Sequence, residues 1–269
     1  MQELEGLEKL SMEAVEALSS LKSEPYWLRE KRLAAFKAAE QLPLPSSRYT
    51  QIRGLNLEEI LPFAAAENLS ALPPELRSTL ESKSSDEGFS VQIDSQVVHV
   101  QLPQALKRKG VVLTSLDTAI KDYPDLVCQY LMSESKYTDK FAALHEAFWS
   151  GGLFLYVPEG VQIERPLQAL YVLKTSGLGA FMHTLIIAER GSKLTYLEEL
   201  YSLDGAERAS LHTGAAELHL KEGAEVSFGS VQNWGPNVFS AINRKALMGK
   251  DTKMSWTLGW LGSRLTISR

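Results

Sequence analysis

The chain has 269 residues, of which 44% are hydrophobic and 23% charged, and its formal net charge is −5. This globular composition lacks the basic excess of a nucleic-acid-binding protein, and its apolar runs are shorter than the about 20 residues that a membrane helix needs. The first 20 residues are acidic and do not resemble a secretory signal. We therefore expect a cytoplasmic protein whose partners are neither nucleic acid nor membrane.

Two amphipathic helices are expected in the first forty residues. Over residues 4–21, apolar side chains recur three or four positions apart and so share one helix face, at Leu7, Leu10, Ala14, Leu18 and Leu21. A second helix starts at Ser23-Glu24-Pro25, where the serine can cap and the proline is tolerated in the first turn, and it ends before Pro43. Residues 43–90 are expected to be irregular, and the composition of residues 82–88 indicates a linker.

The next segment mixes strands and helices. A hairpin is expected to turn at Asp94-Ser95. Residues 116–131 predict a helix that breaks or restarts at Pro124, because proline cannot continue a helix without losing a hydrogen bond. Asp139 is a suitable N-cap for a further helix, which residues 150–152 (Ser-Gly-Gly) end.

From Gly152 onward, short runs rich in β-branched and aromatic residues follow one another. We expect strands over residues 153–157, 169–173, 181–188, 193–197, 210–220, 225–231, 238–246 and 253–258. The runs repeat, since residues 191–196, 223–228 and 251–256 share one frame that ends in an aromatic residue. The apolar position of that frame recurs at Ile163, Leu194, Val226 and Met254, with spacings of 31, 32 and 28 residues.

A period near thirty residues made only of strands is typical of a β-solenoid. A β-sandwich or barrel with glycine turns by chance is the alternative. The expected fold is therefore mainly β, a parallel β-helix preceded by a helical amino-terminal domain, with boundaries at residues 1–95, 96–150 and 151–269. A solenoid that stops at Arg269 without a cap exposes unpaired edges, so we expect the β-helix to be truncated at its carboxy end or capped by a partner.

The residues that could carry metal chemistry are few. Cys128 is the only cysteine, so this chain alone cannot form a disulfide or supply an all-thiolate zinc or iron–sulfur site. Cys128 is expected as a small buried helical residue rather than a reactive thiol. His212 and His219 are seven residues apart and face opposite sides of one strand, which argues against a shared metal. His183 is expected as a hydrogen-bonded core histidine.

Catalytic patterns are also weak. Glu198 and Glu199 are adjacent, and a strand would point them apart, which argues against an acid/base pair. Asp204 and Asp251 are isolated, so the repeats lack the acidic cluster that a calcium-dependent polysaccharide enzyme would use. Gly177 and Gly179 form a GxG, but Met182 occupies the place of the third glycine of a dinucleotide fingerprint. We therefore expect no catalytic and no metal-binding residue.

One polar segment interrupts the repeats. Gln232-Asn233-Trp234 breaks the alternation after a repeat, and Arg244-Lys245 lies on the next expected strand. One interpretation is an indole packed at a coil corner beside solvated cations. The other is the polar lining of a tunnel through the solenoid, for which Gln232, Trp234 and Arg244 are the candidate residues.

Several short segments, spread over nearly the whole chain, together resemble the SufB/SufD family of iron–sulfur cluster assembly proteins. They are Glu24-Pro25-x-Trp27-Leu28 with Arg32-Leu33, Gly110-Val111-Val112, Asp117-Thr118-Ala119, Asp125-Leu126-Val127, Lys140-Phe141-Ala142-Ala143-Leu144, Gly151-Gly152, Tyr156-Val157-Pro158, Gly160-Val161, Pro166-Leu167-Gln168 and His183-Thr184-Leu185-Ile186-Ile187-Ala188. The resemblance implies a helical amino-terminal domain followed by a right-handed parallel β-helix, in agreement with the repeat spacing.

Within the family, the chain resembles SufD more than SufB. Gln232 and Trp234 match residues implicated inside the SufB β-helix, but Leu200 stands where SufB has a cysteine after its Tyr-x-Glu. Val172 and Lys174 stand where SufB has an Arg-x-Asn pair. The resemblance therefore implies a scaffold subunit rather than an enzyme, acting with SufB-like and SufC-like subunits, of which SufC is an ATPase. A β-solenoid that cleaves or binds polysaccharide is the alternative.

The family's carboxy-terminal portion has no counterpart in these 269 residues. In the family it closes the β-helix, joins SufB to SufD, holds SufC and carries the residues thought to ligate the nascent cluster. No cluster ligand can therefore be transferred to this chain. We expect no cofactor on this chain alone and a transient iron–sulfur cluster only on the assembled complex, and a non-functional piece of a longer protein is a third interpretation.

Overall fold

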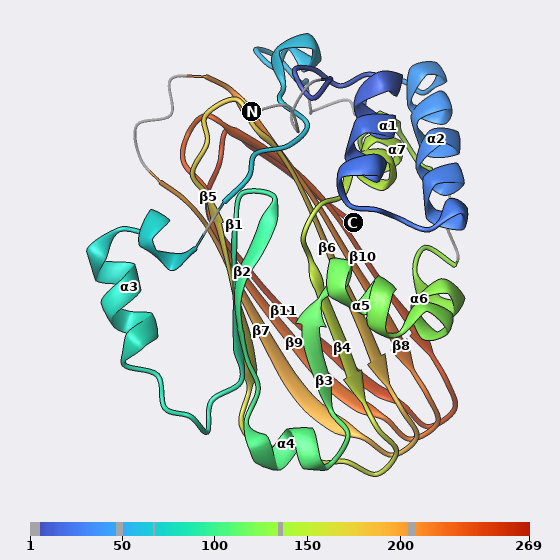
Figure 1. The fold of residues 1–269 in the computed structure, drawn as a ribbon, viewed down its shortest axis with the longest axis vertical. Coiled ribbons are helices and arrows are strands. Elements are labelled where there is room, and N and C mark those ends of the chain that lie inside the picture. The colour runs from blue at the N-terminus through green and yellow to red at the C-terminus, as the bar shows by residue number, and fades with distance from the viewer. Residues whose placement is uncertain (1–5, 47–50, 67, 134–136, 204–207) are drawn as a thin grey trace.

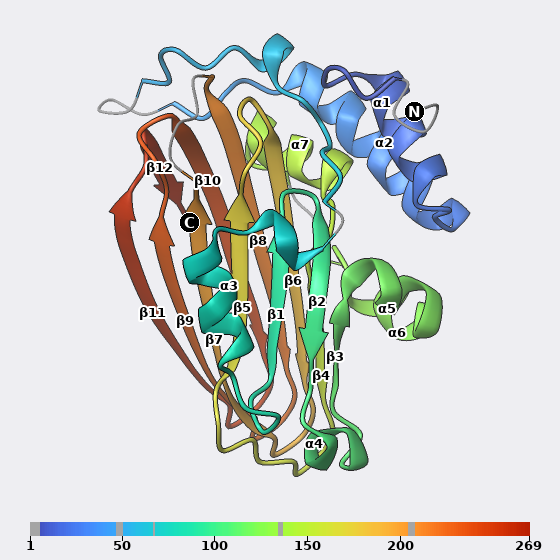
Figure 2. The same ribbon diagram turned by 60° about the vertical axis from the view of Figure 1, so that its left-hand side comes forward.

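The structure is a computed structural model that describes residues 6–46, 51–66, 68–133, 137–203 and 208–269. Two six-stranded β-sheets stack face to face. Helices cover the outer face of one sheet, and a single short helix lies against the outer face of the other (Figures 1 and 2).

The elements have the following bounds. The helices are α1 (Met12–Leu21), α2 (Tyr26–Gln41), α3 (Pro74–Glu81), α4 (Gln104–Arg108), α5 (Leu116–Asp122), α6 (Pro124–Tyr130) and α7 (Lys140–Phe148), with two 3₁₀ turns, η2 (Leu57–Glu59) and η3 (Leu69–Ala71). The strands are β1 (Phe89–Ile93), β2 (Gln96–Gln101), β3 (Val112–Ser115), β4 (Leu153–Val157), β5 (Leu167–Leu173), β6 (Gly179–Ala188), β7 (Lys193–Ser202), β8 (Ser210–Leu220), β9 (Glu225–Asn233), β10 (Val238–Met248), β11 (Lys253–Gly262) and β12 (Leu265–Ser268).

The β-rich part is a parallel solenoid. Successive strands alternate between the sheets, so the first sheet has the order β11-β9-β7-β5-β1-β2 and the second β12-β10-β8-β6-β4-β3. Strands two apart in the chain pair in parallel, as β6, β8 and β10 do. Each coil thus contributes one strand to each sheet, as the repeat spacing predicts. The sandwich alternative is wrong.

The predicted frame places equivalent side chains one above another. Leu194 pairs with Val226, and Val226 with Met254, across β7, β9 and β11. The aromatic position stacks in the same order, with ring centroids 5.1 Å apart between Tyr196 and Phe228 and 4.8 Å apart between Phe228 and Trp256. These ladders face the other sheet and form the interior of the coil.

Two antiparallel additions form the first edge of the solenoid. The predicted hairpin is present, since β1 and β2 turn at Asp94-Ser95, and β1 then pairs in parallel with β5. Asp94 accepts hydrogen bonds from the backbone N–H groups of Lys174 (2.7 Å) and Thr175 (3.0 Å), which ties the turn to the end of β5. Strand β3, which the sequence analysis did not predict, pairs antiparallel with β4. The division into three domains stays a prediction.

Helices α1, α2, α5, α6 and α7, here called the helical layer, pack on the outer face of the second sheet. Phe148 of α7 joins the helices to the sheet, because its ring lies 5.7 Å from Phe36 and 5.6 Å from Phe181. Beneath α2, the Arg32 guanidinium donates two hydrogen bonds to Glu24, at 2.6 and 2.7 Å, and stacks 4.4 Å from the Trp149 ring. This buried ion pair anchors the segment that precedes α2.

The starts of the first two helices differ from the prediction. Helix α1 begins at Met12 because Ser11 caps it by accepting from the Ala14 N–H, so residues 6–11 are not helical, and residues 1–5 lie outside the described residues. Ser23 has a positive φ of 53° and does not cap α2. Pro25 occupies that N-cap position, without a side-chain hydrogen bond.

The irregular structure expected over residues 43–90 is wrong for α3, which ends before the linker predicted over residues 82–88. This helix has Pro74 in its first turn, and its Leu80 packs with Phe89 and Val172 on the outer face of the first sheet. The predicted break at Pro124 is confirmed, since it separates α5 from α6. The predicted cap at Asp139 is also confirmed, because its carboxylate accepts from the Phe141 and Ala142 N–H groups at 2.9 and 3.1 Å.

Replacing Gly152 by alanine is expected to destabilise the protein by about 2 kcal/mol or more. Gly152 has φ +82°, and a Cβ there would lie 2.1 Å from the His183 carbonyl oxygen. Gly160→Ala is the matched control, because Gly160 has a similar φ of +69° but nothing within 4 Å of the added Cβ. Urea unfolding of the two variants checks this, and equal losses would contradict the close approach at Gly152.

Candidate functional site

Polar side chains interrupt the apolar interior of the solenoid. Because successive residues of a strand point to opposite faces, alternate positions of β5 to β10 bring these groups together between the sheets. The interior polar cluster, as we call it, comprises Tyr171, Thr184, Tyr196, Glu198, His212, Ser230, Gln232, Trp234, Ser240 and Arg244.

An ion pair lies at one end of this cluster. The Glu198 carboxylate accepts from the Ser230 hydroxyl at 2.8 Å and lies 3.5 Å from Arg244 Nη2, which itself donates to Ser230 Oγ at 3.0 Å. The Glu198 and Arg244 side chains are 9% and 5% exposed. Burial raises the pKa of Glu198 and lowers the pKa of Arg244, so each group depends on the other to stay charged.

A second chain of hydrogen bonds runs through Gln232. Its amide Nε2 donates to Thr266 Oγ1 at 2.8 Å and to the Gly262 carbonyl at 3.1 Å, and its Oε1 accepts from Ser240 Oγ at 3.1 Å. His212 Nδ1 lies 2.9 Å from the same serine oxygen. Burial, followed by the charge of Arg244, lowers the pKa of His212 to about 3, so this histidine is neutral at physiological pH. The chain therefore ends in a neutral ring.

Two tyrosines extend the cluster toward the first coils. Tyr171 OH lies 3.0 Å from Thr184 Oγ1 and 3.3 Å from Tyr196 OH. Burial raises the pKa of both tyrosines, so both phenols keep their protons. Among the described residues, the interior polar cluster thus offers hydroxyl groups, the Gln232 amide, the Trp234 indole, one neutral imidazole and one ion pair, and none of its members is a thiol.

The cluster borders a small cavity of about 10 Å³ between Glu198, Leu200, His212 and Arg244. This is about the space that one water molecule needs. Leu200 is 4% exposed and belongs to the interior core. The interior is therefore polar but closely packed.

The three tunnel candidates all lie in this interior. Gln232 and Trp234 are 1% and 2% exposed, and the Trp234 indole lies 4.9 Å from the His212 ring. An indole packed at the coil corner is thus confirmed, but the solvated cation at Arg244 is wrong, because a carboxylate holds it inside. Gln232 does not interrupt the alternation, since β9 continues to Asn233. The tunnel role of Gln232, Trp234 and Arg244 stays a prediction.

Other sequence-based assignments can be compared with the structure. Glu198 is inside and Glu199 exposed, as alternation predicts. His212 faces Trp234 inside the coil, whereas His219 lies 4.7 Å from Tyr130 on the outer face. His183 is 1% exposed, and its Nδ1 lies 3.0 Å from His145 Nε2, so it is a hydrogen-bonded core histidine.

The prediction of a buried cysteine is wrong, because Cys128 is exposed on α6. Its place after the buried Val127 puts it on the solvent side of that short helix. Asp251 lies in an exposed turn with φ 55°, and Asp204 is outside the described residues. Val172 faces the apolar cluster under α3 rather than the interior.

The Glu198–Arg244 pair and the partners of His183 were not predicted from the sequence. For Glu198 and Arg244 the signal is positional, because each occupies an inward position of a strand whose neighbouring inward positions are apolar or aromatic. Whether a given residue points inward can be read from the sequence only once the register of every coil is known. The repeated aromatic and apolar residues set the register. A polar residue at one of the inward positions then indicates that a buried partner exists.

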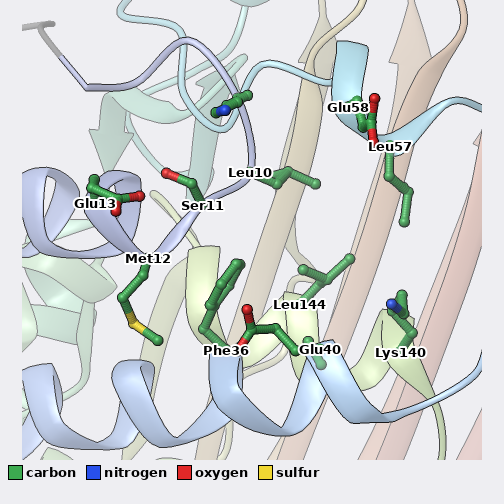
Figure 3. Close-up of a pocket in the computed structure, with 12 residues that line it drawn as sticks. Leu10, Ser11, Met12, Glu13, Phe36, Glu40, Leu57, Glu58, Lys140 and Leu144 are labelled. Carbon is green, nitrogen blue, oxygen red and sulfur yellow. The ribbon is translucent and has the colours of Figure 1, made fainter.

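A larger pocket of about 670 Å³ lies outside the solenoid, between α1, α2, α7 and η2 (Figure 3). Its floor is apolar and its rim is charged, with lining residues that include Leu10, Met12, Phe36, Leu57, Leu144, Glu40, Glu58 and Lys140. The described residues that line it include neither histidine nor cysteine. These lining residues therefore supply neither a thiolate nor an imidazole as a metal ligand.

Two features are absent among the described residues. In this part of the chain, no group of three or more His, Cys, Asp or Glu side chains is arranged to hold a metal ion. None of the helices described here is long and apolar enough to cross a membrane.

Both parts of the chain match models of known protein families. Residues 9–169 match the model described as SufBD protein N-terminal region, and residues 171–269 match SUF system FeS cluster assembly, SufBD core domain. The iron–sulfur cluster assembly protein SufD of Bacillus subtilis is 35% identical over 97% of this chain and 61% of its own length. SufB of the same organism is 31% identical over 96% of this chain and 58% of its own length. The chain thus spans about 60% of the length of these relatives.

Proposed function

Because the chain belongs to the SufBD family of SUF-system iron–sulfur cluster assembly proteins, we propose that it acts as a SufD-like scaffold subunit. In this proposal it works in the cytoplasm with SufB-like and SufC-like subunits and catalyses no reaction itself. Family membership supports a role in assembly, and the residues of the interior support the choice between the two family members.

Leu200 is the observation that carries this proposal. It lies inside the coil, against the cavity that Glu198, His212 and Arg244 border. By resemblance, SufB has a cysteine at this position, and a thiolate there could accept sulfur, whereas a leucine side chain cannot. The interior therefore suits a subunit that supports the assembly site rather than one that takes up sulfur.

The same reasoning applies to the cluster, which is the cargo of the assembly. Stable iron–sulfur ligation needs several thiolates, with histidine in some centres, and the one thiol of this chain, Cys128, is on the outer surface of the helical layer. We therefore propose that this chain holds no cluster alone and that a transient cluster resides only on the assembled complex. Gln232, Trp234 and Arg244 then contribute a polar path through the coil.

Co-purification tests the scaffold role. The tagged 269-residue chain is mixed with SufB-like and SufC-like proteins of the same source and analysed by size-exclusion chromatography, after thermal melting has shown that the chain alone is folded. We expect a complex that contains the SufB-like subunit, which would mean that these 269 residues carry partner surface of their own, besides the carboxy-terminal portion that joins SufB to SufD in the family. Cys128→Ser is the matched control and should co-elute equally, because Cys128 is an exposed side chain outside the interior.

A folded, monodisperse chain that binds neither partner would contradict the scaffold role for this chain. A calcium-dependent lyase activity or glycan binding in the same preparation would favour the polysaccharide alternative instead. Nothing in the described residues favours that alternative, since Glu198, the carboxylate inside the coil, is paired with Arg244.

A further inference from the structure

A second buried polar chain lies on the opposite side of the second sheet, between α7 and the solenoid. His145 of α7 places its Nδ1 3.0 Å from Thr213 Oγ1 and 3.2 Å from the Thr213 carbonyl oxygen. Its Nε2 lies 3.0 Å from His183 Nδ1, and His183 Nε2 lies 3.5 Å from Glu217 Oε2. Four side chains on three elements thus form one line.

The charge of Glu217 determines which atoms donate and which accept along this line of side chains. Its Oε2 accepts the Met132 N–H at 2.8 Å and lies 3.5 Å from His183 Nε2, a buried nitrogen with no hydrogen-bond partner of its own, so the carboxylate favours a proton on that nitrogen. His183 then carries its proton on Nε2 and accepts at Nδ1 from His145 Nε2–H. His145 in turn accepts at Nδ1 from the Thr213 hydroxyl. In this order each ring donates once and accepts once.

The surroundings disfavour additional positive charge. Trp149, whose ring lies 6.0 Å from the His183 ring, is itself covered by two cations, Arg32 of α2 at 4.4 Å and Lys22, the residue after α1, at 5.1 Å. On β8, His219 is near Glu217 on the outer face, and His212 approaches His145 from the interior side. Glu217 is the acidic partner in the line.

We propose that Thr213, His145, His183 and Glu217 form a latch that fastens α7 to the solenoid in neutral solution and releases it in mild acid. The latch joins the helical layer, through His145 and Met132, to strands β6 and β8. A proton added at His183 Nδ1 would set two N–H groups against each other across the 3.0 Å contact. Opening removes this conflict, because water then solvates both rings.

The sign of the pH dependence follows from two groups. Burial, followed by the nearby His183, lowers the pKa of His145 well below 6.5, so the latched state stays unprotonated where the open state binds a proton. Burial acts to raise the pKa of Glu217, but the neighbouring His183 and the Met132 N–H together outweigh burial and hold this pKa below 4.5. Both groups therefore favour the open state as pH falls. His145 contributes about a fivefold increase in the opening constant between pH 6.5 and pH 5.5, and the increase approaches about tenfold per pH unit at lower pH.

Site-resolved amide hydrogen exchange tests the latch, with rates corrected for the intrinsic effect of pH. Amides of α7 and of Met132 and Ser133 are expected to show an opening constant about fivefold larger at pH 5.5 than at pH 6.5. Amides of β9, in the other sheet, are expected to stay constant over that range. Opening that is independent of pH, or equal changes throughout the chain, would overturn the proposal.

Two variants separate the latch from other histidines. His145→Gln keeps a polar side chain but does not titrate, and it is expected to remove the pH dependence at α7. His99→Gln is the matched control, because His99 lies on β2 and stacks on Phe89 at 5.0 Å, in the other sheet. The His99→Gln variant is expected to keep the full pH dependence at α7. Loss of the pH dependence in this control would contradict the assignment to His145.

A measurement on the unmodified chain covers the case in which His145→Gln does not fold. Long-range ¹H–¹⁵N spectra at pH 7 are expected to show both His145 and His183 as neutral Nε2–H tautomers. A neutral Nδ1–H tautomer at either ring, or an imidazolium at His145, would overturn the direction of the latch.

Discussion

Replacing Arg244 by methionine is expected to lower the free energy of unfolding by about 3–5 kcal/mol. The substitution leaves the Glu198 carboxylate inside the solenoid with only the Ser230 hydroxyl, at 2.8 Å, as partner. Burial already raises the pKa of Glu198, and without the guanidinium the carboxyl has to take up a proton or pay the full cost of desolvation. Urea unfolding at pH 7 measures the loss.

The double variant Glu198→Leu/Arg244→Met distinguishes a buried charge from a packing defect. Removing both charges is expected to restore stability to within about 1 kcal/mol of the original chain, because apolar residues of similar volume can replace a buried ion pair. Arg190→Met serves as the surface control, since the Arg190–Glu159 pair is exposed on both sides, and it is expected to leave the unfolding midpoint unchanged. A double variant as unstable as Arg244→Met would show that packing, not charge, dominates.

Replacing Trp149 by alanine is expected to cost about 3–5 kcal/mol. Trp149 is fully buried at the end of α7, where Arg32 and Lys22 lie over its ring at 4.4 and 5.1 Å. Its loss leaves a cavity between the helical layer and the second sheet and removes two cation–π contacts. Thermal and urea unfolding, followed by far-UV circular dichroism, measure the effect.

Trp27→Ala is the matched control for Trp149. Trp27 is half-buried on α2 and has one cation, Lys31, at 5.5 Å from its ring. It is expected to cost less than half as much as Trp149→Ala, because less apolar surface is exposed. Equal losses for the two tryptophans would contradict the central place of Trp149 in the contact between the helices and the solenoid.

The solenoid could be predicted because residues that stack in successive coils recur at regular intervals in the sequence. Parallel coils place equivalent residues in contact, so the same residue types recur at Leu194, Val226 and Met254. A period of two within each strand and of about thirty between coils leaves few other folds that bury those positions together. Packing of one repeat on the next requires this repetition.

The ends of the strands could not be predicted in the same way. Strands β7 and β9 continue through Glu198 and Gln232, which read as the polar end of a strand because neither residue usually lies in a core. Their burial depends on partners far along the chain, Arg244 for Glu198 and Ser240 for Gln232. A local pattern cannot show a pairing that only the stacking of coils creates.

The short elements were missed for a related reason. Helix α3 has eight residues, too few to establish a helical period, and it is held by contacts of Leu80 with Phe89 and Val172. Cys128 was misplaced because α6 has only seven residues, which give no clear apolar face. In both cases tertiary contacts, and not local preference, decide the structure.

The single exposed thiol on α6 has a practical use. A maleimide dye attached to Cys128 would label each 269-residue chain once, at a surface site outside the solenoid interior. Because α6 is part of the helical layer, such a dye would travel with the helices rather than with the strands. A second probe on the outer face of β9 could form a fluorescence-quenching pair with this dye. The pair would then report the separation of the helical layer from the first sheet directly, in real time and in single molecules.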